Sequence, residues 1–241
     1  MKQALLTITE NAPLTESVYR MRLAGDTGRL RPGQFVNIKI EGLFLRRPIS
    51  VCDREDGLLT IIYKVVGSGT EIMRRMQPGE KLDTLCGLGN GYDASLAGEK
   101  PLLIGGGVGV PPLYYLAKTL VNQGITPLVI LGFNTAEEVF YEDEFRALGC
   151  EVRVTTADGS YGVRGFVTAA MPNEASYFYA CGPEPMLKAV CRASCCPGEL
   201  SFEERMGCGF GACMGCSCMT ITGSKRICKE GPVLKKEELL W

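Results

Sequence analysis

Short runs of alternating apolar and polar residues fill the first 96 residues of the chain. Residues 36–40 place valine and isoleucine at every second position, a period of two that is typical of a half-buried strand. Residues 19–23 alternate in the same way, and residues 58–66 form a third run that is rich in β-branched side chains. Turns that contain glycine and proline separate these runs. Many short strands at this spacing predict a small antiparallel barrel.

The pattern changes near Gly98, where buried strands begin to alternate with helices. The predicted strands cover residues 101–104, 128–133, 151–155 and 177–181. The predicted helices, in which apolar residues recur at helical spacing, cover residues 110–122, 137–148 and 185–195. This alternation predicts a doubly wound parallel sheet, so the expected fold class is a β domain followed by an α/β domain.

The two patterns and a cysteine-rich end divide the chain into three parts. We expect a barrel domain at residues 1–97, an α/β domain at residues 98–200 and a small C-terminal segment at residues 201–241. The last segment is too short to bury a core of its own, so we expect it to dock on its neighbours or on a partner.

Composition narrows the chemistry and the compartment. The chain of 241 residues carries a net charge of −1, which offers no electrostatic footprint for nucleic acid or an anionic membrane. It contains no histidine, so histidine acid–base catalysis and histidine metal ligands are excluded. Twelve cysteines occur without a signal-peptide pattern and without a membrane-spanning run. We therefore expect reduced thiols and a cytoplasmic protein.

Three cysteines crowd together near the C-terminus, and a fourth stands apart. Cys208, Cys213 and Cys216 have the C-x4-C-x2-C spacing of a plant-type [2Fe–2S] site, and Cys228 supplies a further thiol. The glycines between them allow the loop to curl over a cluster. The alternative is a zinc site, although closed four-thiolate zinc sites usually combine two short cysteine pairs. Cys218 is a fifth thiol that competes as a ligand.

Two segments of the first domain have the character of an anion site. Arg46-Arg47-Pro48-Ile49-Ser50 pairs two cations with a rigid proline, and arginine offers forked donors that suit phosphate. Gly67-Ser68-Gly69-Thr70 opens a short helix, whose free N–H groups favour anions. The alternative for the arginines is a solvated face. Together the two segments indicate a pyrophosphate held across the barrel.

Two further motifs follow predicted strands of the α/β domain. The turn Gly105-Gly106-Gly107-Val108-Gly109 opens a helix and can cradle a dinucleotide pyrophosphate, although it departs from the G-x-G-x-x-G fingerprint. The alternative is an ordinary strand–helix turn. Cys181-Gly182-Pro183 lies where ligands bind to a parallel sheet, but Cys181 has an equally good alternative as a small buried hydrophobe.

The order of these motifs resembles the ferredoxin-reductase superfamily, in which an FAD-binding Greek-key barrel precedes an NAD(P)-binding domain. The C-terminal motif Cys-Gly-x-Gly-Ala-Cys-x-x-Cys, with a later Cys228-Lys-Glu-Gly-Pro-Val233, narrows the match. It resembles the family of electron-transfer subunits of type B dihydroorotate dehydrogenases over essentially the whole chain. Its four cluster ligands match Cys208, Cys213, Cys216 and Cys228. The matching FAD-binding positions are Arg47, Pro48, Ile49, Ser50, Ile62, Tyr63, Lys64, Gly69 and Thr70.

The resemblance also implies the remaining cofactors and the partner. The partner would be an FMN subunit that oxidises dihydroorotate for pyrimidine biosynthesis, in a heterotetramer with two copies of each chain. This chain would pass the electrons through [2Fe–2S] and FAD to NAD⁺, with Cys181 ordering the nicotinamide. A reductase subunit of an NAD(P)H:ferredoxin or sulfide-linked oxidoreductase is the first alternative. A zinc-binding interaction protein that catalyses nothing is the second.

The loop after the second α/β strand predicts the choice of nicotinamide. In doubly wound domains this loop meets the adenine ribose. Residues 132–138 contain no arginine or lysine, and they include Glu137 and Glu138. A 2′-phosphate would find no partner there and would face like charge, which predicts NAD(H) over NADP(H).

Overall fold

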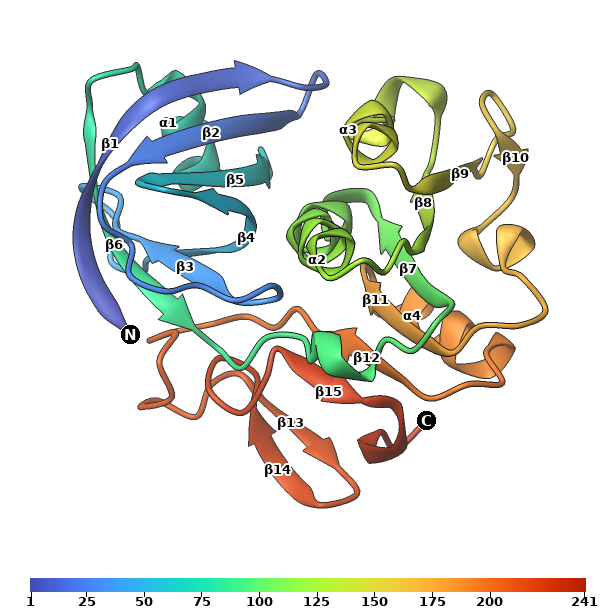
Figure 1. The fold of residues 1–241 in the computed structure, drawn as a ribbon. Helices are drawn as coiled ribbons and strands as arrows, with labels where there is room; N and C mark the ends of the chain where they lie inside the picture. The colour runs from blue at the N-terminus through green and yellow to red at the C-terminus, as the bar shows by residue number, and fades with distance from the viewer.

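The computed structural model describes residues 1–241 and contains a closed, six-stranded antiparallel barrel. The barrel strands are β1 (Lys2–Pro13), β2 (Val18–Ala24), β3 (Phe35–Ile38), β4 (Arg47–Glu55), β5 (Leu58–Lys64) and β6 (Lys81–Leu88). Their spatial order is β1-β2-β5-β4-β3-β6, so that β6 returns beside β3 in a Greek key. Helix α1 (Ser68–Arg75) buries Met73 in the barrel core. The predicted barrel is confirmed, and it occupies the blue and cyan half of Figure 1.

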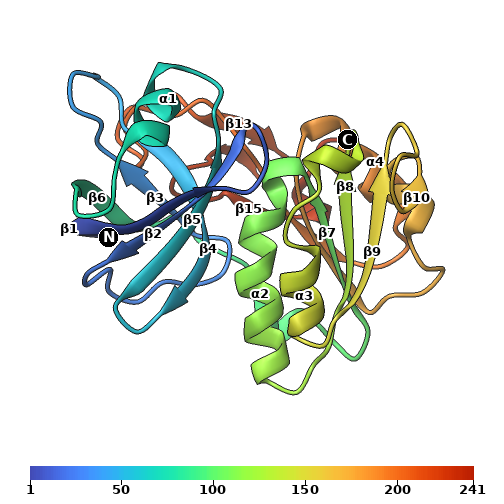
Figure 2. The same cartoon turned by 90° about the horizontal axis from the view of Figure 1, so that it is seen from above.

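A seven-stranded sheet forms the other half of the molecule. Its strands, in spatial order, are β10 (Val163–Arg164), β9 (Glu151–Thr156), β8 (Leu128–Phe133), β7 (Pro101–Gly106), β11 (Tyr177–Cys181), β12 (Gly198–Ser201) and β15 (Val233–Lys235). All neighbours are parallel except β15, which runs antiparallel to β12. Helices α2 (Val110–Asn122) and α3 (Glu142–Ala147) cover the face nearer the barrel, and α4 (Glu184–Ala193) covers the other, as Figure 2 shows. This arrangement confirms the doubly wound sheet.

Helix α2 joins the two halves. Its Lys118 ammonium lies 2.8 Å from Asp53 and 2.9 Å from Glu55 on β4. The Tyr115 hydroxyl donates to the Leu30 carbonyl at 3.1 Å. The apolar face of α2 packs against both the sheet and the outer surface of the barrel in one hydrophobic cluster. The relative placement of barrel and sheet therefore rests on buried contacts.

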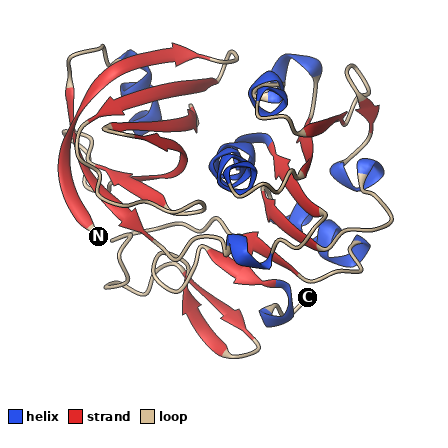
Figure 3. Cartoon of the chain, viewed as in Figure 1, coloured by secondary structure: helices blue, strands red, loops and turns tan.

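The C-terminal segment builds no separate layer. Strands β13 (Ser217–Thr220) and β14 (Gly223–Arg226) form a hairpin, and most of the segment is loop, drawn tan in Figure 3. β15 extends the large sheet, whereas Ile227 and Leu234 pack against Phe35 and Leu88 of the barrel. The segment docks on both neighbours, as its length predicts.

One predicted helix, at residues 137–148, is only partly confirmed. Residues 137–148 contain a 3-10 turn at Ala136–Glu138 and then an α-helix only from Glu142. Tyr141 interrupts the pattern with a φ of 68°, because its ring and that of Phe140 turn inward to an aromatic cluster. The other 3-10 helices are Ala94–Leu96, Gly107–Gly109, Val167–Ala170 and Lys236–Glu238. None of the helices combines the length and the apolar character that a membrane span needs.

Candidate functional site

The four predicted cluster cysteines form two pairs. Cys208 and Cys213 make one, because the Cys208 amide donates to Cys213 Sγ and the Cys213 amide donates to Cys208 Sγ, both at 3.4 Å. Cys216 and Cys228 make the other, with the Cys228 amide 3.4 Å from Cys216 Sγ. We call these the outer pair and the inner pair, because Cys213 is exposed whereas both members of the inner pair are 2 % exposed.

The backbone of the cysteine loop is shaped to point N–H groups at sulfur. Gly209 and Gly211 have φ values of 75° and 91°, which only glycine adopts readily. With this turn, the Ala212 amide donates to Cys208 Sγ at 3.2 Å. Partial burial opposes ionisation of Cys208, but the backbone donors outweigh it and lower the pKa of Cys208 to about 6. A thiolate at this position is therefore stabilised before any metal is added.

The inner pair has the opposite environment. Cys216 and Cys228 belong to a hydrophobic cluster with Phe35, Leu88 and Leu234. Burial, followed by the neighbouring Cys216 thiol, raises the pKa of Cys228 to about 12. A cation bound at its sulfur would favour ionisation of Cys228.

The donor set fits a dinuclear cluster better than a single ion. A [2Fe–2S] cluster takes four thiolates, two for each iron, which the two pairs can supply. A closed zinc site instead usually combines two short cysteine pairs, whereas Cys228 stands 12 residues after Cys216. Cys218 lies on β13 opposite Lys225 and makes no hydrogen bond with either pair.

Two residues that the sequence did not single out support the loop. Arg226 donates to the Gly211 carbonyl at 2.6 Å and forms an ion pair with Glu230. The Arg226 guanidinium lowers the pKa of Glu230 to about 2. Asn90 donates through Nδ2 to the Val233 carbonyl at 2.6 Å and accepts from the Val233 amide at 3.1 Å. No local motif marks Asn90, because its partners lie more than a hundred residues away in sequence.

The predicted anion segments of the barrel lie together. Arg47 begins β4, and its guanidinium lies directly over Gly69 at the start of α1, where any Cβ would collide with it. The same side chain donates to the Leu45 carbonyl. Thr70 Oγ accepts from the amides of Val66 at 3.0 Å and Gly67 at 3.3 Å, which fixes the turn before the helix. A cation and a helix N-terminus therefore face the same space.

The matching positions on β5 split between two faces. Tyr63 points into the barrel core, and its hydroxyl donates to Asn11 Oδ1 at 2.9 Å. Ile62 points outward and is buried against the cluster that contains α2, whereas Lys64 is exposed at the strand end. Ser50 and Pro48 are half-buried on β4, opposite Phe35 and Asn37 of β3.

The glycine-rich turn and Cys181 meet at the switch point of the sheet. β7 and β11 are neighbours in the sheet, with Gly105 opposite Cys181, and ligands bind at such carboxyl ends. Gly105, Gly106 and Gly109 are needed for packing, because a Cβ would meet Val110, Met186 or the Cys181 carbonyl. Gly107, with a φ of 51°, faces open space and leaves room for a ligand.

Cys181 is unsuited to act as a nucleophile. Burial raises the pKa of its thiol to about 12, so it is neutral near pH 7. It lies at the end of β11, beside Gly182, where it can contact a ring that binds at the switch point. A neutral thiol at this place is therefore suited to positioning a bound ring by contact.

The loop after β8 carries the carboxylates of Glu137 and Glu138. Glu138 accepts from the Asn134 amide at 3.0 Å and from Asn134 Nδ2 at 2.8 Å. No cation forms an ion pair with Glu137 or Glu138. The fold brings residues 158–160 beside this loop, since the Asp158 amide donates to the Asn134 carbonyl at 3.2 Å. Arg164, which packs over Gly159, is a nearby cation that the local sequence did not reveal.

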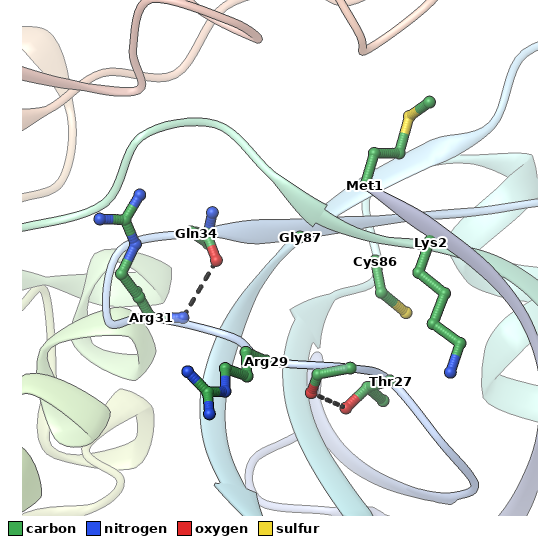
Figure 4. A pocket seen from close by; sticks show the side chains of 9 residues that line it. Met1, Lys2, Thr27, Arg29, Arg31, Gln34, Cys86 and Gly87 are labelled. Carbon is green, nitrogen blue, oxygen red and sulfur yellow. Dashed lines mark hydrogen bonds between the residues drawn. The ribbon is translucent and has the colours of Figure 1, made fainter.

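A cavity of about 400 Å³ lies elsewhere on the barrel, between the start of β1, the end of β6 and residues 27–34 (Figure 4). Lys2, Arg29 and Arg31 line it, and none of the predicted site residues does. Its cationic side chains point in different directions in Figure 4, so they do not converge on one ligand position.

Comparison with known proteins agrees with this geometry. Residues 203–240 match the iron-sulfur cluster binding domain of dihydroorotate dehydrogenase B, and residues 103–192 match an oxidoreductase NAD-binding domain. The solved structure of an NADH-dependent reduced ferredoxin-NADP oxidoreductase superposes with a TM-score of 0.89 at 31% identity, covering 99% of this chain and 90% of that one. The ferredoxin reductase of carbazole 1,9a-dioxygenase, 23% identical with a TM-score of 0.71, covers 79% of this chain and 64% of its own and shares the fold.

Curated relatives match from end to end. A protein of Geobacillus sp. (strain WCH70) is 44% identical over 100% of this chain and 99% of its own length. One of Fusobacterium nucleatum is 45% identical over 97% and 96%. Both are named as the electron transfer subunit of dihydroorotate dehydrogenase B (NAD⁺), and the chain belongs to this family of electron transfer subunits.

Proposed function

We propose that this chain takes electrons from a dihydroorotate-oxidising FMN subunit and delivers them through [2Fe–2S] and FAD to NAD⁺ in pyrimidine biosynthesis. A flavin supplies the exchange between single electrons from a cluster and the hydride that nicotinamide accepts. The remaining task of the protein is to hold the cluster, the flavin and the nicotinamide close enough for electron transfer.

The main observation that supports this proposal is the pairing of residues between β3 and β4. Pro48 and Ser50 of the flavin segment lie opposite Asn37 and Phe35. Directly opposed residues of antiparallel strands point to the same face. Phe35 packs on the inner cysteine pair, and Asn37 bonds to the Cys208 carbonyl. Strand β3 therefore contacts both cysteine pairs and also pairs, at the usual strand spacing of about 4.8 Å, with the β4 segment that we assign to FAD.

We assign the cofactors to residues as follows. Residues 1–97 hold FAD, residues 98–200 bind NAD(H), and residues 201–241 hold the cluster. Arg47 and the start of α1 bind the FAD phosphates, and Gly107 approaches the NAD pyrophosphate. The outer pair holds one iron and the inner pair the other, and Cys218 is not a ligand. Cys181 orders the nicotinamide.

The assembly is the finer part of the proposal. The chain acts in the cytoplasm, in a heterotetramer of two copies of each subunit. Co-expression with an FMN-containing dihydroorotate dehydrogenase subunit tests it: a complex of two plus two chains that reduces NAD⁺ with dihydroorotate is expected. A chain that stays alone, or a complex without this activity, would contradict the assignment.

A reductase subunit for ferredoxin is the second candidate. The superposition on the NADH-dependent reduced ferredoxin-NADP oxidoreductase supports it. Reduction of ferredoxin by NADH, measured with the complex purified from its host, separates the two candidates.

A further inference from the structure

We propose that Asn37 is a positioning residue for electron transfer, whose side-chain amide fixes the Cys208 loop against the strand beside the flavin segment. This inference rests on the proposed function, because it requires that flavin and cluster exchange electrons. Asn37 lies in the middle of β3, and nothing in the local sequence sets it apart from other polar strand positions.

The amide joins two distant parts of the chain. Asn37 Nδ2 donates to the Cys208 carbonyl at 3.2 Å, across 171 residues of sequence. Gly209 passes directly over the same nitrogen, and any Cβ at this position would collide with it. The loop that carries the outer pair is thus laid on Asn37 with no side chain between them.

Stability alone does not explain a polar residue here. Asn37 is 1 % exposed, and its second polar atom, Oδ1, has no hydrogen-bond donor. A buried polar atom without a partner disfavours folding, so an apolar side chain of similar size would be better tolerated. Features that are retained against stability are expected at functional sites.

The strand beneath the amide is held on both sides. Pro48, the residue opposite Asn37 on β4, has no N–H to offer. The Arg46 guanidinium instead donates to the Asn37 carbonyl at 3.3 Å and binds Asp83 of β6 through both carboxylate oxygens. The Asn37 side chain therefore projects from a fixed frame and can set the position of the loop.

Loosening this contact would change the cluster electronically. The Ala212 and Cys213 amides point at Cys208 Sγ from the loop that Asn37 fixes. Hydrogen bonds to sulfur stabilise the additional negative charge of a reduced cluster, so fewer of them lower its potential. Misplacement of the loop also lengthens the path from the flavin.

The test compares Asn37→Leu, Asn37→Asp and a control, Asn122→Leu, which makes the same change at the exposed end of α2. The readouts are iron and flavin content, thermal stability of the apoprotein, the cluster potential from an EPR-monitored redox titration, and the flavin-to-cluster rate after NADH mixing. We expect Asn37→Leu to keep both cofactors and to melt no earlier than the wild type. Its cluster potential becomes more negative, and its rate falls roughly 10- to 100-fold, as misplacement in a preorganised site predicts.

Asn37→Asp keeps the side-chain volume but turns an oxygen toward the Cys208 carbonyl, so we expect a shift in the same direction. A wild-type potential and rate in either variant would overturn the inference. So would loss of both cofactors in Asn37→Leu, which would mark Asn37 as structural. If the wild-type flavin, once reduced by NADH, does not reduce the cluster, the proposed function fails and takes the inference with it; a defect confined to the Asn37 variants leaves the function intact.

Discussion

The outer and inner cysteine pairs lie in the same C-terminal segment but differ in exposure, in pKa and in the groups that surround them. The outer pair is accessible, its Cys208 has a pKa near 6, and backbone amides surround its sulfurs. The inner pair is 2 % exposed, has a Cys228 pKa of about 12 and belongs to a hydrophobic cluster with the barrel. The outer pair is organised by the loop backbone, whereas the inner pair is organised by packing.

This difference shows how a segment without its own core can present a rigid site. Strand β15 begins five residues after Cys228 and completes the edge of the large sheet, so the inner pair is fixed from behind. The outer pair needs contacts from elsewhere, which Asn37 and Arg226 supply. The inner pair is therefore fixed by the packing of the fold itself, whereas the outer pair is held in place by side chains from other parts of the chain.

Serine substitution of the cysteines has the largest expected effect. Each of Cys208→Ser, Cys213→Ser, Cys216→Ser and Cys228→Ser loses the cluster, whereas Cys218→Ser keeps it. Cys228→Ser should also destabilise the apoprotein by about 1–3 kcal/mol, because it buries a hydroxyl, while Cys213→Ser should not. Iron analysis after anaerobic purification and thermal melts of the apoproteins measure both. A cluster retained in Cys228→Ser but lost in Cys218→Ser would refute the ligand assignment.

Removal of Arg47 tests whether both pairs are independent of the flavin site. Arg47→Ala loses a charged hydrogen bond to phosphate, which contributes about 1.5–3 kcal/mol, or roughly 10- to 150-fold in FAD affinity. Iron content should not change. Flavin titration of the deflavinated protein measures the affinity, with Arg29→Ala at the barrel cavity as the matched control. Equal affinities in the two variants would show that Arg47 does not bind the cofactor.

The preference for NADH or NADPH tests the NAD-binding end of the proposed electron path, which lies away from both cysteine pairs. We expect kcat/KM for NADH to exceed that for NADPH at least about tenfold, since an unpaired charged group costs roughly 1.5–3 kcal/mol. Steady-state rates with an artificial acceptor measure this ratio. Preference for NADPH would show that a cation reaches the loop after β8. Arg164 would then be the first residue to replace by alanine.

The smallest effect concerns the sheet edge that fixes the inner pair. Glu199 on β12 is 5 % exposed, and burial raises its pKa from 4.5 to about 7. A raised carboxyl pKa stabilises the fold below pH 4.5, and this contribution is lost as pH rises through 7. At pH 8, Glu199→Gln should therefore unfold at a higher temperature than the wild type, with a free energy of unfolding that is larger by about 1–3 kcal/mol. At pH 5 the two proteins should unfold at nearly the same temperature. Thermal melts at both pH values decide this, and a parallel pH dependence in the two proteins would exclude Glu199 as its source.

The sequence predicted what depends on local pattern. Alternation at residues 36–40 and the cysteine spacing led to the barrel and the cluster loop. The helix predicted at residues 137–148 is interrupted before Glu142, because burial of Phe140 and Tyr141 overrides helical spacing. Asn37 and Asn90 could not be foreseen, because their partners Cys208 and Val233 lie 171 and 143 residues away. Likewise, only the fold shows that Gly105 and Gly106 at the end of β7, and Gly109 in the turn that follows, are needed for packing.

The most direct test of electron transfer is the EPR spectrum of the anaerobically purified protein after NADH is added. If the flavin segment and the cluster loop form one path, NADH reduces the FAD, and the signal of a reduced [2Fe–2S] cluster appears in proportion to the flavin. A protein with full FAD and iron in which NADH bleaches the flavin but produces no cluster signal would contradict the account.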